Sequence, residues 1–266
     1  MVVVAQSGQP ARIDAIIFDV DGVLIASPHE RAWREALAEL MASDRQTSTT
    51  ATTYTAAAFT SAVYQEVVAG KPRLDGATAL VEYFGLPRAA QRAVELARRK
   101  QDIVDALIER GDFEAFQDGL RLVVALRARG VRLGVASSSK NADRFLERVQ
   151  LNSRQTLRDA FDANVSGRDL ARGKPYPDIF LLAAQELDLP PARCVVVEDA
   201  TSGIQAARAA GMLGLGVARL DDADLLRAAR ADLVVTSLDM VVVDALVDGR
   251  LESSYGHQSP IGARGK

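Results

Sequence analysis

The alternation of apolar and polar positions divides the chain into three parts. Residues 15–18 form a continuous apolar run that is typical of a buried parallel strand. From Glu30 to Gly111, apolar residues recur at helical spacing and no segment resembles a strand. From Gly119 onward, short apolar runs alternate with amphipathic helical segments. This order predicts an α/β fold, with a doubly wound parallel-sheet (Rossmann-like) core and an all-helical cap domain inserted after the first strand.

The element boundaries are predicted from glycine and proline breaks between the periodic segments. In the insert we expect a loop at Ala42–Thr53 and helices at Glu30–Met41, Tyr54–Ala69, Asp75–Phe84 and Arg88–Arg110. After it we expect strands at 131–136, 161–165, 194–197, 213–218 and 233–235, and helices at 120–128, 142–149, 179–187 and 202–210. The predicted core comprises residues 1–27 and 117–251, the cap comprises residues 28–116, and residues 252–266 form a polar tail that we expect to be disordered.

The composition argues against several classes of protein. The 266 residues carry a net charge of -3 with no basic block, which disfavours nucleic acid and anionic membranes as partners. Cys194 is the single cysteine and lies in an apolar run, which fits a strand thiol in a reducing compartment. Two histidines are too few for a histidine-rich zinc site, and no apolar segment approaches the length of a signal or membrane-spanning sequence. We expect a monomeric cytoplasmic protein with no nucleic acid and no membrane partner.

The first candidate for chemistry directly follows the first strand. Asp19 and Asp21 are separated by one residue and are followed by Gly22. Because alternate residues of an extended chain point the same way, both carboxylates can face one pocket. Two close carboxylates repel each other unless a cation lies between them or one is protonated. The pattern therefore indicates a metal ion, an acid/base pair or both, although Asp and Gly after a strand also occur in ordinary turns.

Further polar clusters follow later strands or precede a helix. They are Ser137–Asn141, Lys174, and Glu198 with Asp199. Each has a structural alternative, namely a helix cap, a solvated lysine and a simple turn. If the strands are parallel, however, all the clusters meet at one edge of the sheet. Such a set suits phosphoryl transfer, because carboxylates bind Mg²⁺ and the lysine and hydroxyl bind phosphate oxygens. Asp19 can then act as nucleophile, and Asp21 can give or take a proton.

These stretches resemble the four motifs of the haloacid dehalogenase superfamily. The matching stretches are Asp19–Val23, the serine after the second core strand, Gly173–Asp178 and Glu198–Ile204. The resemblance implies that Asp19 is the nucleophile and a metal ligand, and that Asp21 is the acid/base and lends its backbone carbonyl to Mg²⁺. It also implies that Glu198 and Asp199 complete the metal site, and that Lys174 and Ser137 hold the transferring phosphoryl group.

Within the superfamily the chain resembles the β-phosphoglucomutase group. The resemblance implies that Lys100 meets the transfer site and that His29 helps to sense the sugar and to position the acid/base. The expected grip on the distal phosphate of a small phosphorylated sugar comprises Arg73, which follows Gly70, together with Ser139, Lys140 and Asn141. The connection between Asp21 and His29 is shorter than in that group, with Ala26 where an Asp is usual, and Arg73 and Lys100 also fit solvated helix charges.

Three functions remain open from the sequence. The first is a β-phosphoglucomutase, which converts β-glucose 1-phosphate to glucose 6-phosphate through the 1,6-bisphosphate and needs two phosphate subsites. The second is a sugar-phosphate phosphatase with water as the final acceptor. The third is a signalling receiver domain, which the helical insert and the length disfavour. A dehalogenase is disfavoured because Asp21 would have no proton to manage.

Overall fold

The computed structural model describes residues 12–45, 52–69 and 71–254. The chain divides into two compact units, each of which has most of its residue contacts within itself. The first comprises residues 1–26 and 115–266, and the second comprises residues 27–114. Among the described residues, no helix is both long enough and apolar enough to cross a membrane.

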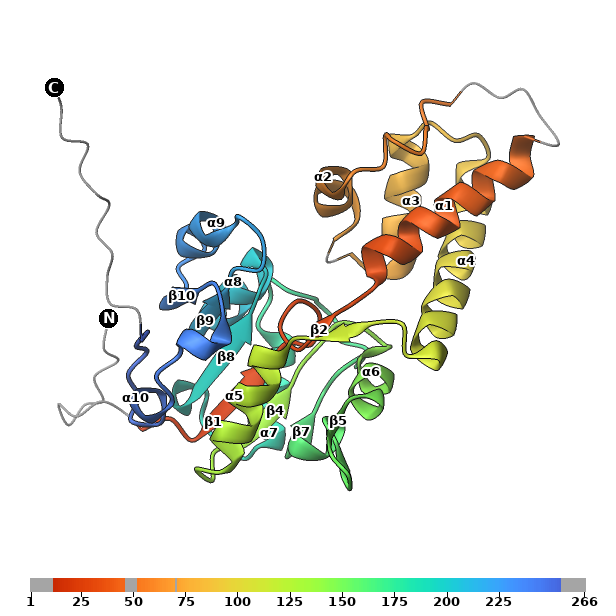
Figure 1. The fold of residues 1–266 in the computed structure, drawn as a ribbon. Coiled ribbons are helices and arrows are strands. Elements are labelled where there is room, and N and C mark those ends of the chain that lie inside the picture. Colours follow the sequence, from red (N-terminus) through yellow and green to blue (C-terminus); the bar gives the residue numbers. More distant parts are fainter. Residues whose placement is uncertain (1–11, 46–51, 70, 255–266) are drawn as a thin grey trace, which may run out of the picture. The chain divides into compact units, whose positions relative to one another are not determined.

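A six-stranded sheet forms the centre of the first unit (Figure 1). Its strand order is β10-β9-β8-β1-β4-β7, and all its paired strands are parallel. The strands are β1 (Ala15–Phe18), β4 (Arg132–Val135), β7 (Ala163–Asn164), β8 (Cys194–Glu198), β9 (Leu213–Val217) and β10 (Leu233–Val235). This architecture confirms the predicted doubly wound α/β core.

The register of the central strands places their carboxyl ends side by side. Phe18 at the end of β1 lies opposite Val135 of β4 and Val197 of β8. Residues that directly follow β1 and β4, or that end β8, must therefore meet at the same edge of the sheet. Two small separate sheets pair β2 (Ile25–Ala26) with β3 (Glu114–Ala115), and β5 (Gln150–Asn152) with β6 (Gln155–Thr156).

Helices cover the sheet because each strand presents apolar residues to its faces. Ile17 and Val196 pack against Phe180 of α7 and Ala206 of α8, with Cys194 buried in the same cluster as a strand thiol. The helix α5 packs against β4 and lies in front of the sheet in Figure 1. The helices are α5 (Gln117–Arg127), α6 (Ala142–Arg148), α7 (Asp178–Glu186), α8 (Thr201–Ala209), α9 (Ala223–Ala228) and α10 (Val243–Val247), with 3₁₀ turns at Arg158–Ala160, Pro191–Arg193 and Leu238–Met240.

The second unit is helical, as the periodicity predicts. It contains α1 (His29–Arg45), α2 (Ser61–Val63), the π-helical turn η1 (Tyr64–Val68), α3 (Arg73–Tyr83) and α4 (Ala89–Arg110). Its apolar core includes Trp33, Leu37, Leu80 and Leu96. These residues bury the apolar stripes of α1, α3 and α4, and this packing supplies most of the stability of such helices.

The helix predicted at Tyr54–Ala69 is wrong over its first half. Helical structure begins only at Ser61, where the Thr60 hydroxyl caps α2 by accepting a hydrogen bond from the Val63 amide. Upstream, the hydroxyls of Thr52 and Thr55 accept hydrogen bonds from the amides of Tyr54 and Ala58. Threonine hydroxyls thus satisfy backbone groups that a helix would otherwise pair.

Two further differences concern polar segments. The hairpin β5–β6 was not predicted, because it is formed by polar residues such as Asn152 and Gln155, whose amide side chains hydrogen-bond to each other. In the expected tail, the Glu252 carbonyl accepts a hydrogen bond from the Val242 amide, and the Ser254 amide donates to Met240. The expectation of disorder is therefore wrong for residues 252–254, and residues 255–266 lie outside the described part of the chain.

Candidate active site

The site begins at the turn after β1. Asp19 is 6 % exposed, and its amide donates a 3.0 Å hydrogen bond to the Val197 carbonyl of β8. Gly22 has a φ of +77°, a conformation that side-chain-bearing residues rarely adopt, and its amide donates to the Ile25 carbonyl at 2.8 Å. The Leu24 and Ile25 amides both donate to Val20 at 2.9 Å. The chain thus folds tightly back on itself and holds the Asp19 and Asp21 backbone at the sheet edge.

The Lys174 ammonium lies between two carboxylates of the site. Its Nζ donates to Asp19 Oδ1 at 2.7 Å and to Glu198 Oε1 at 2.6 Å. Burial would lower the pKa of Lys174, but the charges of Asp19 and Glu198 raise it above its usual range. Lys174 is therefore largely buried and paired with two carboxylates, so it is not the solvated surface charge that the sequence left open.

Glu198 is the last residue of β8, and its side chain lies against the start of α8. Its Oε2 accepts hydrogen bonds from the amides of Asp199 and Ala200, at 3.1 and 3.0 Å. Gly203 makes this possible, because a Cβ there would lie 1.8 Å from Glu198 Oε1. Gly203 lies in the motif stretch Glu198–Ile204, but the sequence reasoning gave it no role of its own, although a glycine in the first turn of a helix that follows two acids is a usable signal.

Three carboxylates of the site can share one cation. Asp19, Glu198 and Asp199 each offer an oxygen, and these oxygens lie within 4.8 Å of one another. Burial, with the neighbouring acids, raises the pKa of Asp19 to about 7 and that of Asp199 well above its usual range. One lysine does not balance these charges. A hard dication fits the donor set, because it would supply the missing positive charge and prefers carboxylate oxygens.

The Asp21 side chain belongs to the neighbouring serine loop rather than to the carboxylate cluster. Ser137 lies two residues after the end of β4, and its hydroxyl donates to Asp21 Oδ2 at 3.3 Å. The Ser137 hydroxyl also accepts from the Ser139 amide at 3.0 Å, and the Ser139 hydroxyl accepts from the Asn141 amide at 3.2 Å. Asp21 and Ser137 are thus in contact, as the parallel-sheet argument predicts.

Lys140 behaves differently from its neighbours in this loop. Its side chain is 71 % exposed and forms a 2.7 Å ion pair with Asp169. The structure therefore does not bring the Lys140 ammonium to Asp21 or Ser137. A phosphate group bound by Lys140 would have to replace Asp169 as its partner. An exposed ion pair of this kind contributes little free energy, so the exchange costs little.

Within the helical unit, Lys100 and His29 lie together. Lys100 is 6 % exposed, so it is not a solvated helix charge. Its Nζ lies 3.4 Å from His29 Nδ1 and 5.5 Å from the centre of the Trp33 ring. Arg73 is exposed and donates a hydrogen bond to Gln101 Oε1. Gly70 lies outside the described residues.

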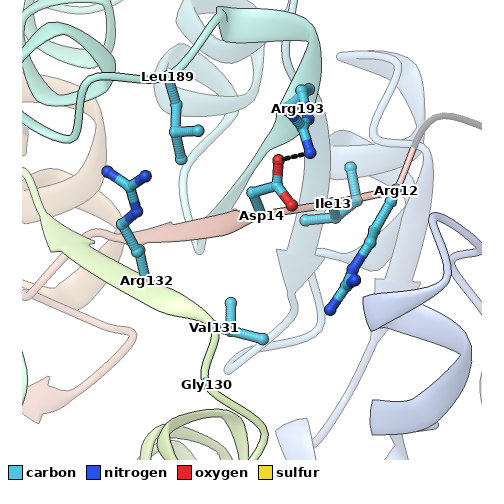
Figure 2. A pocket seen from close by; sticks show the side chains of 8 residues that line it. All are labelled: Arg12, Ile13, Asp14, Gly130, Val131, Arg132, Leu189 and Arg193. Atoms are coloured by element: carbon cyan, nitrogen blue, oxygen red, sulfur yellow. Dashed lines mark ion pairs between the residues drawn. The ribbon is translucent and has the colours of Figure 1, made fainter.

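A cavity of about 250 Å³ lies at the other end of the central strands, before β1 (Figure 2). Arg12, Arg132 and Arg193 line it, but Arg193 pairs with Asp14 and Arg132 donates to the Leu187 carbonyl. Two of its three guanidinium groups are therefore used within the fold. The carboxylate cluster instead follows β1, and the cavity is not part of it.

Comparison with known proteins shows the family to which the chain belongs. The family model of haloacid dehalogenase-like hydrolases matches residues 13–211. The chain is 33 % identical to the β-phosphoglucomutase of Bacillus subtilis over 233 residues, which is 84 % of this chain and 93 % of that protein. It is 32 % identical to the fructose-1-phosphate phosphatase YqaB of Escherichia coli over 207 residues, covering 76 % and 94 % of the two chains.

A solved structure of an archaeal β-phosphoglucomutase from Pyrococcus is also similar. It superimposes with a TM-score of 0.67 at 31 % sequence identity, covering 88 % of this chain and 96 % of that one. The relatives include both mutases and phosphatases, and both kinds are enzymes. The chain belongs to the haloacid dehalogenase-like hydrolase family and is a phosphatase or phosphomutase.

Proposed function

We propose that this enzyme transfers a phosphoryl group from a small sugar phosphate through an aspartyl-phosphate on Asp19, and that it acts as a β-phosphoglucomutase. The observation that carries the proposal is the joint placement of Asp19 beside Lys174 and of Asp21 beside Ser137. The first pair provides a nucleophile next to a fixed cation. The second pair provides an acid/base next to a hydroxyl that can bind a phosphate oxygen.

The first half-reaction follows from these positions. An Asp19 carboxylate oxygen attacks phosphorus and forms an O–P bond while the bond from phosphorus to the sugar oxygen breaks. The Asp21 carboxyl gives its proton to the leaving sugar oxygen. Lys174 and Ser137 bind the oxygens of the transferring group and offset its charge.

The second half-reaction reverses the roles. Asp21 takes the proton from an incoming hydroxyl, whose oxygen attacks the phosphoryl group and releases the Asp19 carboxylate. In a mutase the hydroxyl belongs to a sugar phosphate, and the bisphosphate turns round between the two halves. In a phosphatase the hydroxyl belongs to water.

Mg²⁺ is the cofactor that the carboxylate cluster fits best. The side chains that would hold it are those of Asp19, Glu198 and Asp199. The family resemblance adds the backbone carbonyl of Asp21 to this set. When bound, Mg²⁺ supplies positive charge that neutralises the phosphoryl oxygens. The positive charge of Lys174 acts in the same direction.

The mutase assignment rests on the residues available for a second phosphate. Lys100 is a buried cation beside His29, and Arg73 is a nearby exposed cation on α3 of the same unit. The proposal gives Arg73, Ser139, Lys140 and Asn141 the distal phosphate. Arg73 and Lys140 each have a protein partner, Gln101 and Asp169, that phosphate would replace. The relationship to β-phosphoglucomutases supports this choice.

The alternative is a sugar-phosphate phosphatase, which the similarity to a fructose-1-phosphate phosphatase favours. It uses the same aspartyl-phosphate but needs no distal grip.

One assay separates the two functions. Wild-type enzyme is incubated with β-glucose 1-phosphate, Mg²⁺ and a trace of β-glucose 1,6-bisphosphate, and glucose 6-phosphate and free phosphate are measured in parallel. Glucose 6-phosphate in large excess supports the mutase, and free phosphate alone supports the phosphatase. The Asp19→Asn variant is the control and should form neither product. Absence of both products with wild-type enzyme would exclude β-glucose 1-phosphate as substrate.

A further inference from the structure

A largely buried arginine, Arg219, hydrogen-bonds to the turn that carries Asp21. Arg219 follows β9, which is two strands away from β1 in the sheet. Its Nε donates to the Gly22 carbonyl at 2.9 Å, and its Nη2 donates to the Val23 carbonyl at 3.0 Å. The side chain is 15 % exposed. A guanidinium group has the fixed fork geometry that two adjacent carbonyls require.

Asp118 binds the same guanidinium through its Nη1 and Nη2 atoms. Asp118 Oδ2 accepts from Arg219 Nη1 at 2.7 Å, and Oδ1 accepts from Nη2 at 3.1 Å. The carboxylate also accepts from the Leu238 amide and the Ser237 hydroxyl, at 2.8 and 3.1 Å. The ring of Phe116 lies 3.8 Å from Arg219 Cζ. The orientation of Arg219 is therefore fixed by several elements of the core.

The gripped turn has little room to move. The Phe116 amide donates to the Leu24 carbonyl at 2.9 Å, and a Cβ on Gly119 would lie 2.9 Å from the Val23 carbonyl oxygen. On the other side, a Cβ on Gly22 would lie 1.7 Å from Asp199 Oδ2. A displacement of the turn would therefore press Gly22 against Asp199 or draw it away, and would move Asp21 with it.

We propose that Arg219, held by Asp118, is a positioning residue for phosphoryl transfer that fixes the Gly22–Val23 backbone and thereby aligns Asp21 and Asp199. The role of Asp21 as acid/base comes from the proposed function, so this inference rests on it. Arg219 itself does not touch the reacting atoms. Its effect must appear in the rate of the chemical step, because a small misplacement of a reactive group costs rate more than binding.

A merely structural role for the pair predicts a different outcome. A buried ion pair is weak evidence for stability, since its desolvation cost offsets much of its attraction. If Arg219 served only to neutralise Asp118, the lysine variant Arg219→Lys would suffice. If Arg219 positions the turn, lysine fails, because a single ammonium lacks the planar fork that holds Gly22 and Val23 together.

The test compares Arg219→Lys and Arg219→Met with the control Arg208→Met. Arg208 forms a similar two-oxygen pair with Asp232, at 2.9 and 3.0 Å, at the end of α8 and away from residues 20–24. For each variant kcat and KM are measured on the substrate that the wild-type enzyme turns over. Hydrogen exchange is measured at the Gly22, Leu24 and Ile25 amides without substrate.

We expect Arg219→Lys to lower kcat by about 10- to 100-fold with KM changed by less than about threefold, and to speed exchange at the three amides. Arg208→Met should do neither. A folded Arg219→Lys variant with wild-type kcat, or with a loss confined to KM, would overturn the inference whatever its exchange rates. If Arg219→Met does not fold, Arg219→Lys alone decides. Wild-type enzyme that transfers no phosphoryl group would instead contradict the proposed function.

Discussion

Lys174 Nζ lies 2.7 Å from Asp19 Oδ1 in the largely buried site, 155 residues away along the chain. The lysine leaves Asp19 with a raised pKa of about 7, because burial and the charges of Glu198 and Asp21 outweigh its attraction. The positive charge of Lys174 therefore offsets only part of the negative charge of the neighbouring carboxylates. Several expected properties of the enzyme depend on this imbalance.

Replacement of the lysine tests whether its charge takes part in the reaction. Lys174→Met should lower kcat by about 100- to 1,000-fold, because a fixed cation next to the developing charge is lost. The control is Lys71→Met, whose Nζ donates to the Val67 carbonyl within the helical unit. Steady-state kinetics with Mg²⁺ checks the prediction, and activity of Lys174→Met within about threefold of wild type would contradict it.

The pH dependence of stability should change with Mg²⁺. The pKa of Asp19 is raised from 3.8 to about 7 in the folded protein. Without metal, the corresponding stability is therefore complete below about pH 4 and is lost as the pH rises through about 7. Mg²⁺ requires deprotonated carboxylates, so it should raise the Tm more at pH 8 than at pH 5.

The control for this effect is Asp19→Asn. It removes the titrating group, so the metal-free variant should lose less stability than wild type between pH 5 and 8. The Tm of both proteins, measured by thermal unfolding in EDTA and in Mg²⁺ at pH 5 and pH 8, checks this prediction. An equal Mg²⁺ effect at pH 5 and pH 8 would show that the acids of the cluster do not control metal binding.

The close contact between Gly203 and Glu198 predicts a strong effect of one methyl group. In Gly203→Ala, the new Cβ would collide with Glu198 Oε1. Without any shift of the structure, the two atoms would be only 1.8 Å apart. We expect the free energy of unfolding to fall by about 1–3 kcal/mol and the Mg²⁺ affinity to fall with it. Gln205→Ala, at an exposed position of the same helix, is the matched control. Urea unfolding and Mg²⁺ titration check both, and an unchanged Gly203→Ala variant would refute the contact.

The distal phosphate grip can be separated from the chemistry at Asp19. Arg73→Ala should lower glucose 6-phosphate formation by about 10- to 100-fold, the loss expected for a charged hydrogen bond, while free phosphate release changes little. Arg98→Ala is the control, since Arg98 is exposed and pairs with Asp102 on its own helix. Full mutase activity in Arg73→Ala would favour the phosphatase.

The placement of most candidate site residues was predictable from the sequence because they lie at strand ends; Lys174, which precedes α7, is the exception. The run at residues 15–18 is recognisable by its apolar residues, and parallel pairing then brings the following acids to one edge. The contacts of Asp19 with Lys174 and of Asp21 with Ser137 agree with that argument. Lys140 departs from it, because the direction of an exposed side chain depends on neighbours such as Asp169.

Features that depend on tertiary contacts were not predictable. Arg219 follows its strand like any solvated charge, and only the folded chain shows that it reaches Gly22 and Val23. The threonine segment before Ser61 has apolar residues at helical spacing, but its hydroxyls compete for the backbone. Periodicity records where side chains are buried, not which groups the backbone hydrogen-bonds.

The placement of β1 has a consequence for synthesis of the chain. Among the six described strands of the sheet, β1 is synthesised first, yet it lies between β4 and β8, which are made much later. Until Cys194–Glu198 emerges, the apolar residues Ile16 and Ile17 lack one of their two neighbours. Sheets with such long-range pairing form slowly, and the unpaired strand edge is prone to aggregation in the meantime. The nascent chain should therefore need chaperone protection until most of its length has been made.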